Sequence, residues 1–264
     1  MSLRHWEAYA MRYATVNRRR QENFIAYDPH DEATHMDYFV WFLKSGGETI
    51  LVDTGFSAET AQRRGRTHLR CPIESLHEAG IKLDDIAETV ITHAHYDHAG
   101  NTRMLKRTRF HLQEREMVYA TGKEMRHAYC RHAYDAHDVC QLVHANFEER
   151  VEFHEGSYEL RPGITVHWVG GHTRGLQIVR VHTKRGWIVL ASDASHYLEN
   201  FRKRSPFPIV CDVGEMLRGY ELIEALADSP EHVIAGHDPL MNRLYRPAGP
   251  QGLEIVSLTE PLGQ

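Results

Sequence analysis

The sequence predicts a layered α/β fold in a single domain over residues 1–264. Many apolar runs have the length of strands, and helical periodicity lies between them. No long linker, low-complexity tract or internal repeat divides the chain. Because 42% of the 264 residues are hydrophobic, the chain is long enough to bury a full core.

The predicted strands are runs rich in apolar, β-branched and aromatic residues. They cover residues 38–43, 49–52, 89–92, 109–112, 164–169, 177–182, 187–191 and 232–235. Turn residues separate neighbouring runs at Gly46-Gly47 and at Arg185-Gly186. Both turns predict hairpins.

Helices are predicted between the strands. A capped amphipathic helix begins after Asp212, because Glu215 follows three residues later and apolar residues then recur at spacings of one and three up to Leu226. The segment 112–149 is charged and mainly helical in pattern, which predicts a solvated helical insertion. Such an insertion can also shape the rim of an active site.

Composition and charge exclude several classes of function. The chain has 31 Lys and Arg against 36 Asp and Glu, so its formal net charge of -5 offers no global positive field for nucleic acid. No apolar run approaches the ~18 residues of a membrane helix, and the amino terminus lacks the apolar region of a secretory signal. The four cysteines form no CxxC pair, which favours reduced thiols. We therefore expect a cytoplasmic protein without nucleic-acid or membrane partners.

Residues 90–100, Val-Ile-Thr-His-Ala-His-Tyr-Asp-His-Ala-Gly, carry the strongest chemical signal. An apolar strand leads directly into four potential metal ligands, His93, His95, Asp97 and His98. In an extended segment the first two point to the same side, and the following turn can bring the others toward a second nearby point. This geometry suits two metal ions in one pocket. A surface His-X-His pair or a helix cap gives the same local pattern, so other segments must supply further ligands.

Three more predicted strands end in potential ligands. His172 lies in Gly-Gly-His-Thr, Asp193 in Ser-Asp-Ala-Ser and His237 in Ala-Gly-His-Asp, each directly after an apolar run. A lone histidine at such a place is more often structural and a lone aspartate more often a cap. Four strand ends in series favour a shared site at one edge of the fold.

Taken together, HAHYDH, GGHT, SDAS and AGHD in this order resemble the metallo-β-lactamase superfamily, and within it the N-acyl homoserine lactonases. The resemblance covers nearly the whole chain and includes the strand and turn ILVDTG at residues 50–55. It implies an αββα sandwich, in which two mixed sheets pack face to face with helices outside and a metal centre at one edge.

The resemblance also implies two sets of ligands and a bridging residue. One cation is expected at His93, His95 and His172, the other at Asp97, His98 and His237, with Asp193 bridging both. Zinc is the expected metal, because neutral imidazoles and carboxylates suit it and a centre without cysteine is consistent with hydrolysis.

The predicted reaction is the opening of the lactone ring of an N-acyl homoserine lactone. Two cations about 3.5 Å apart lower the pKa of a bridging water and polarise the carbonyl, so no protein nucleophile is required. Asp97 is the predicted proton shuttle. The partner is thus a small acyl lactone or related ester, and because dimers occur among similar enzymes the resemblance also admits a homodimer.

One departure from the family concerns the substrate contact. The lactonases commonly carry Asp-Ala-Ser-Tyr, whereas this chain reads Asp193-Ala194-Ser195-His196-Tyr197. We predict that Tyr197 contacts the substrate carbonyl, because a phenol donates one hydrogen bond without competing strongly for metal. The alternatives, that His196 makes this contact or that both residues only pack, stay open. Asp53 is a candidate acceptor for the ring N–H of a ligand histidine.

Other activities on the same centre are the main alternatives. They are hydrolysis of a thioester such as an acyl-glutathione, of a β-lactam or of an unrelated lactone. A redox protein similar to the flavodiiron proteins is disfavoured, because that relative usually carries Glu where His95 stands. A nuclease is disfavoured by the net charge, and a non-catalytic binding protein by the seven intact candidate ligands.

Overall fold

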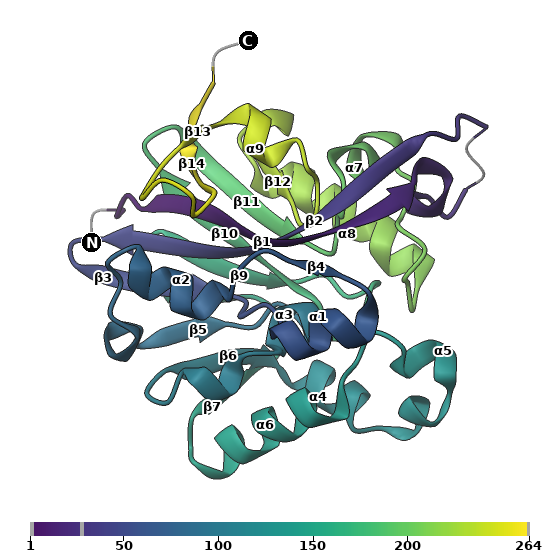
Figure 1. The fold of residues 1–264 in the computed structure, drawn as a ribbon, viewed down its shortest axis with the longest axis horizontal. Coiled ribbons are helices and arrows are strands. Elements are labelled where there is room, and N and C mark those ends of the chain that lie inside the picture. Colours follow the sequence, from purple (N-terminus) through teal and green to yellow (C-terminus); the bar gives the residue numbers. More distant parts are fainter. Residues whose placement is uncertain (1–2, 27–28, 263–264) are drawn as a thin grey trace.

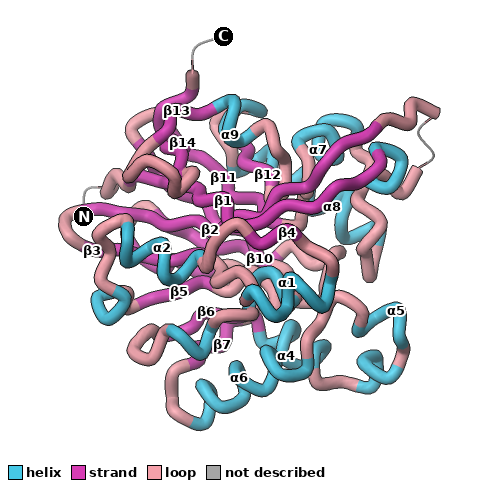
Figure 2. Tube along the Cα trace, in the orientation of Figure 1, coloured by secondary structure: helices cyan, strands magenta, loops and turns pink. Residues whose placement is uncertain are grey.

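The computed structural model describes residues 3–26 and 29–262, and two β-sheets packed face to face form its centre (Figure 1). Among these residues the larger sheet has nine strands in the order β13-β14-β1-β2-β3-β5-β6-β7, with β4 paired to β1. The second sheet has five in the order β12-β11-β10-β9-β8. Helices lie on the outside of both sheets (Figure 2), which confirms the predicted αββα sandwich.

The strands of the larger sheet are β1 (Glu7–Arg19), β2 (Ala33–Ser45), β3 (Glu48–Val52), β4 (Thr67–His68), β5 (Glu88–Val90), β6 (Arg109–Gln113), β7 (Val151–His154), β13 (Tyr245–Pro247) and β14 (Ile255–Pro261). Those of the second sheet are β8 (Tyr158–Arg161), β9 (Ile164–Trp168), β10 (Gln177–Thr183), β11 (Gly186–Ser192) and β12 (Val233–Ala235). All eight predicted strands are present. The predicted hairpins also occur, since Ser45 pairs with Glu48 and Thr183 pairs with Gly186.

The α-helices are α1 (Ala58–Arg64), α2 (Pro72–Glu78), α3 (Tyr96–Ala99), α4 (Glu114–Ala120), α5 (Ala128–Arg131), α6 (Ala136–Phe147), α7 (Leu198–Lys203), α8 (Val213–Leu226) and α9 (Met241–Leu244). Short 3-10 helices are η1 (Arg20–Asn23), η2 (Leu83–Asp85), η3 (Thr102–Met104), η4 (Lys123–Arg126) and η5 (Pro230–His232). The predicted capped helix is α8, in which the side chain of Asp212 accepts the main-chain N–H of Glu215 at 2.9 Å. Between β6 and β7 the charged segment forms α4, η4, α5 and α6.

The core is built by strands that are apolar on both faces. In β2, Phe39, Trp41 and Leu43 lie between the two sheets, whereas the alternating Tyr38 and Phe42 belong to the layer that includes residues of α1 and α2. A third cluster packs α8 against the second sheet. None of the helices within the described ranges combines the length and the apolarity needed to cross a membrane.

The arrangement of the strand ends determines where a site can form. β3, β5 and β6 run parallel to one another, and β11 runs parallel to β12. The carboxyl ends of parallel strands meet at one edge of a sheet. The candidate ligands follow these ends, at β5 in the larger sheet and at β11 and β12 in the second.

Candidate metal centre

The structure brings all seven predicted ligands together in one buried cluster. Their relative exposures range from 0% to 7%. The ligand atoms of these seven residues form two compact groups, His93, His95, His172 and Asp193 in one and Asp97, His98 and His237 in the other, and Asp193 and His237 form a third group with His196. These are the two sets that the sequence predicts, although the role of each residue as a ligand stays a prediction.

The chain turns sharply where it delivers Asp193 and His237. β11 and β12 are parallel, and Ser192 pairs with Ala235 just before the two ligands. Ser192 has a left-handed φ of 45°, which is uncommon outside glycine and costs backbone strain. A Cβ on Gly236 would lie 2.5 Å from the main-chain oxygen of Ser192, so only glycine permits this approach.

The carboxylate of Asp193 lies between the two groups. Its Oδ2 is 3.1 Å from Nε2 of His172 and 3.8 Å from Nε2 of His93. Its Oδ1 is 3.0 Å from Nε2 of His237 and 3.2 Å from Nε2 of His98. One oxygen therefore faces each set of imidazoles, which is the geometry of a bridging ligand.

The nitrogen atoms of the cluster are arranged for a cation. Nδ1 of His95 lies 3.0 Å from Nε2 of both His93 and His172, and one shared proton cannot satisfy three converging lone pairs. Within the described part of the chain, Nε2 of His98 makes no well-aligned hydrogen bond, although Oδ1 of Asp193 lies 3.2 Å away. Buried polar atoms are normally paired, so the converging nitrogen lone pairs fit a site that binds a metal ion.

Hydrogen bonds from outside the cluster orient the rings. Nδ1 of His98 lies 2.7 Å from Oδ2 of Asp53, as the sequence analysis anticipated. Nδ1 of His172 lies 2.7 Å from the carbonyl oxygen of Ile209, and Nδ1 of His237 lies 2.8 Å from that of Asp37. Each acceptor fixes the proton on Nδ1 and leaves the Nε2 lone pair facing the cluster.

Burial and charge set the ionisation of the cluster. Burial, together with neighbouring imidazoles, lowers the pKa of His93 and of His95 well below the ordinary value. Burial alone would raise the pKa of Asp193, but the surrounding histidines lower it well below the ordinary value. His93, His95 and Asp193 are thus in the forms that bind metal, whereas nearby carboxylates, Asp193 foremost, outweigh burial and raise the pKa of His98 and of His237.

His196 and Tyr197 occupy different surroundings. His196 is buried, with Nε2 3.0 Å from Oδ2 of Asp193 and its ring stacked on Phe207 at 3.9 Å. The hydroxyl of Tyr197 donates to the carbonyl oxygen of His35 at 3.2 Å and lines a separate cavity. The sequence-based choice of Tyr197 rested on its phenol being a single donor that competes weakly for metal, and its role as the substrate contact stays a prediction.

A pocket of about 220 Å³ reaches the cluster at His95 and His172. Its other walls come from the charged insertion, from the loop after β9 and from the segment before α8: Tyr119, Glu124, Tyr129, Cys130, His132, Tyr134, Arg174, Ile209, Val210 and Cys211. The insertion therefore does form part of the rim.

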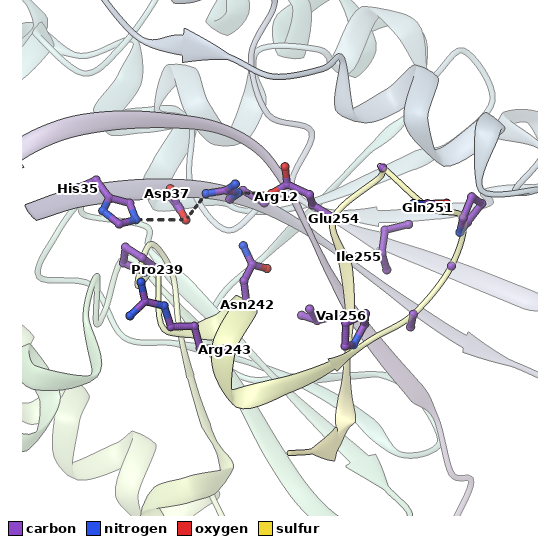
Figure 3. Close-up of a pocket in the computed structure, with 15 residues that line it drawn as sticks. Arg12, His35, Asp37, Pro239, Asn242, Arg243, Gln251, Glu254, Ile255 and Val256 are labelled. Carbon is purple, nitrogen blue, oxygen red and sulfur yellow. Dashed lines mark hydrogen bonds and ion pairs between the residues drawn. The ribbon is translucent and has the colours of Figure 1, made fainter. Parts of the chain in front are cut away.

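A second cavity, of about 450 Å³, lies on the other side of Asp37 (Figure 3). Asp37 directs its carbonyl oxygen to His237, while its carboxylate accepts a hydrogen bond from Arg12 at 3.0 Å in this cavity. Among the described residues that line the cavity, none belongs to the ligand cluster. Of these two cavities, the pocket at His95 is the one lined by residues of the cluster.

Comparison with known proteins agrees with this geometry. Residues 34–237 match the sequence profile of the Metallo-beta-lactamase superfamily. An N-acyl homoserine lactonase of Bacillus thuringiensis is 27% identical over 188 residues, which are 66% of this chain and 70% of that protein.

Two solved structures share the fold. A quorum-quenching N-acyl homoserine lactone lactonase superposes with a TM-score of 0.76 at 23% identity, covering 93% of this chain and 97% of that chain. A dizinc quorum-quenching lactonase superposes with a TM-score of 0.67 at 16% identity, covering 90% of each chain.

Proposed function

Because this chain belongs to the metallo-β-lactamase superfamily, we propose that it is a dinuclear metal-dependent hydrolase that opens the lactone ring of N-acyl homoserine lactones. The observation that carries the proposal is the placement of Asp193 between two sets of buried imidazoles, beside a pocket that reaches His95 and His172. The similarity to lactonases supports the choice of substrate. Such an activity would make the protein a quorum-quenching enzyme.

Two divalent cations, which we propose to be zinc, would be held by the residues of the cluster. His93, His95 and His172 would hold one, Asp97, His98 and His237 the other, and Asp193 would contribute one oxygen to each. When bound, such cations supply a hydroxide near neutral pH and polarise an ester carbonyl. The all-nitrogen-and-oxygen donor set and the related dizinc lactonase support zinc.

Asp97 is suited to move the proton. Its Oδ2 lies 3.7 Å from Nε2 of His98 and 3.8 Å from Nε2 of His237, and it is slightly more exposed than most of the cluster. The hydroxyl of Tyr13 donates to its carbonyl oxygen at 3.0 Å, which fixes the backbone. A carboxylate held in this position can accept a proton from water and return it to the leaving alkoxide.

We propose that His196, and not Tyr197, is the polar residue that contacts the carboxylate of Asp193. Nδ1 of His196 has no hydrogen-bond partner among the described residues, unlike the outer nitrogens of His98, His172 and His237. This difference supports His196 as a donor from Nε2 to Asp193 and not as an eighth ligand. The acyl part of the substrate would occupy the pocket walled by Tyr119, Tyr129 and Ile209.

Metal quantification followed by a substrate panel tests the proposal. We expect close to two equivalents of zinc per chain and faster opening of acyl homoserine lactones than hydrolysis of thioesters, β-lactams or unrelated lactones. Equal or faster turnover of an acyl-glutathione or of nitrocefin would contradict the lactonase assignment and favour another hydrolase on the same centre. Redox-active iron with oxygen consumption would contradict the hydrolytic assignment altogether.

A further inference from the structure

Glu116 is a buried carboxylate that no catalytic step uses. It lies on α4, within the charged insertion, and its relative exposure is 0%. Burying a charged group is costly unless hydrogen bonds compensate for the lost water. The hydrogen bonds of Glu116 therefore have to compensate for its burial.

Four donors surround the carboxylate of Glu116. Oε1 accepts the main-chain N–H of Ala94 at 2.9 Å and the hydroxyl of Tyr134 at 2.8 Å. Oε2 accepts the hydroxyl of Thr173 at 2.6 Å and the main-chain N–H of Gly175 at 3.0 Å. Hydrogen bonds to an ionised acceptor are about twice as strong as neutral ones, so this carboxylate holds its donors firmly.

Three of the four donors belong to the two loops that carry ligands of one proposed cation, and the fourth, Tyr134, contacts one of these ligands. Ala94 lies between His93 and His95, and the ring of Tyr134 packs edge-on against His95 with centroids 4.6 Å apart. Thr173 directly follows His172. One oxygen of Glu116 thus fixes the loop after β5, and the other fixes the loop after β9, although these strands belong to different sheets.

The loop after β9 packs closely against α4. A Cβ on Gly175 would lie 2.3 Å from both the main-chain nitrogen and the Cβ of Glu116. The loop from His172 to Gly175 therefore rests directly on α4. A change at Glu116 would be transmitted to His172 without an intervening flexible segment.

The other half of the cluster is supported elsewhere. His98 is oriented by Asp53, and His237 by the carbonyl oxygen of Asp37. The four hydrogen bonds of Glu116 reach neither of these two ligands. Glu116 therefore supports only the first half directly, whereas Asp53 orients His98 and also holds Thr92, whose hydroxyl lies 3.2 Å from Nδ1 of His93.

We propose that Glu116 is a positioning residue for the cation site formed by His93, His95 and His172. The inference rests on the dinuclear centre proposed above. The proposal predicts that loss of the Glu116 carboxylate lowers the affinity for the cation at His93, His95 and His172 more than the affinity for the other cation. In Glu116→Gln the amide has one acceptor oxygen, so the donors of only one loop stay paired and the other loop is released.

Metal binding without substrate tests the proposal. The Glu116→Gln protein is loaded with 113Cd²⁺, and the two sites are followed by cadmium NMR and by titration against a chelator. We expect one resonance to shift or broaden, with an affinity lower by about tenfold or more, and the other to keep an affinity within about threefold of wild type. Asp53→Asn, by contrast, should also change the resonance of the site that contains His98.

Glu114→Gln is the matched control, because Glu114 lies on the same helix and is exposed. The proposal would be overturned if Glu116→Gln lowered the affinity for both cations equally, or if its cation affinities did not differ from those of Glu114→Gln. If Glu116→Gln does not fold, Thr173→Val removes a single donor, and the same selective weakening is required of it. Failure of wild-type protein to bind two cations would instead refute the dinuclear centre, and failure to open lactones would refute only the substrate.

Discussion

Asp53 accepts the Nδ1–H of His98 at 2.7 Å with one carboxylate oxygen and the main-chain N–H of Thr92 at 2.7 Å with the other. Asp53 is fully buried, and its φ of 63° is left-handed. Strain of this kind persists only where the surroundings enforce it, and it often marks a functional site. The end of β3 is thus locked to the ligand-bearing segment after β5.

Asp53→Asn should therefore weaken metal binding. The amide has one acceptor oxygen, so it must release either His98 or Thr92, and loss of such a partner lowers metal affinity by about tenfold or more. A competition titration with a chromophoric chelator measures the change. Asp84→Asn, at a largely exposed aspartate, is the control. An unchanged affinity in Asp53→Asn would show that the bond does not orient the ligand.

Substitution of His196 and Tyr197 distinguishes their roles. His196→Ala should lower kcat/KM by about tenfold or more, because the bridging carboxylate loses a hydrogen-bond donor. Tyr197→Phe should leave kcat/KM near the wild-type value and cost ~1 kcal/mol of stability through the lost bond to His35. Steady-state kinetics with one lactone and urea unfolding measure both effects. The reverse order of kinetic effects would restore the role that the sequence assigned to Tyr197.

Asp193→Ala should abolish hydrolysis and reduce the bound metal. Each oxygen of this carboxylate faces a different set of imidazoles, so its removal takes one donor from both proposed cations. Elemental analysis and a lactone assay on the same preparation check the two expectations. Full activity in this variant would exclude a bridging role.

Asp138 should make stability depend on pH. It is buried on α6, and burial, with a smaller contribution from Asp135, raises its pKa to about 7. The folded-state pKa lies above the unfolded value of ~3.9, so the folded chain binds this proton more tightly and loses that advantage as the pH rises from about 4 to about 7. Relative to wild type, Asp138→Asn should gain ~2 kcal/mol between about pH 5.5 and about pH 8. Urea unfolding at both pH values measures the gain, and a difference that does not change with pH would contradict it.

The sequence predicts which seven residues gather in one cluster, because each follows a local pattern. His172, Asp193 and His237 all directly follow an apolar run, and parallel strands carry their ends to one edge. The long pairing of β1 with β2 inside the larger sheet was not predicted, because the apolar residues of β1 include few β-branched ones and are interrupted by Arg12 and by polar residues after Ala14. β4, β7, β8, β13 and β14 are short, polar or terminal and were missed for the same reason.

Residues defined by tertiary contacts could not be found from the sequence. Glu116 looks like any glutamate of a charged helix, and its four partners lie between 18 and 59 positions away. His196 reaches Asp193 only because the chain turns back after β11, where the main-chain N–H of Ser195 donates to the oxygen of Ser192. A glutamate can support the site only when it is buried, and the local spacing of residues does not predict that burial.

The proposed ligands belong to both sheets: four follow β5 of the larger sheet, and three follow β9, β11 and β12 of the second. Each bound cation would consequently cross-link two layers that otherwise adhere through apolar contacts such as those of Trp41 and Leu190. A cation present at a hundredfold excess over its dissociation constant adds ~2.7 kcal/mol to the free energy of unfolding. Starvation for metal would then reduce the lifetime of the folded chain as well as its turnover.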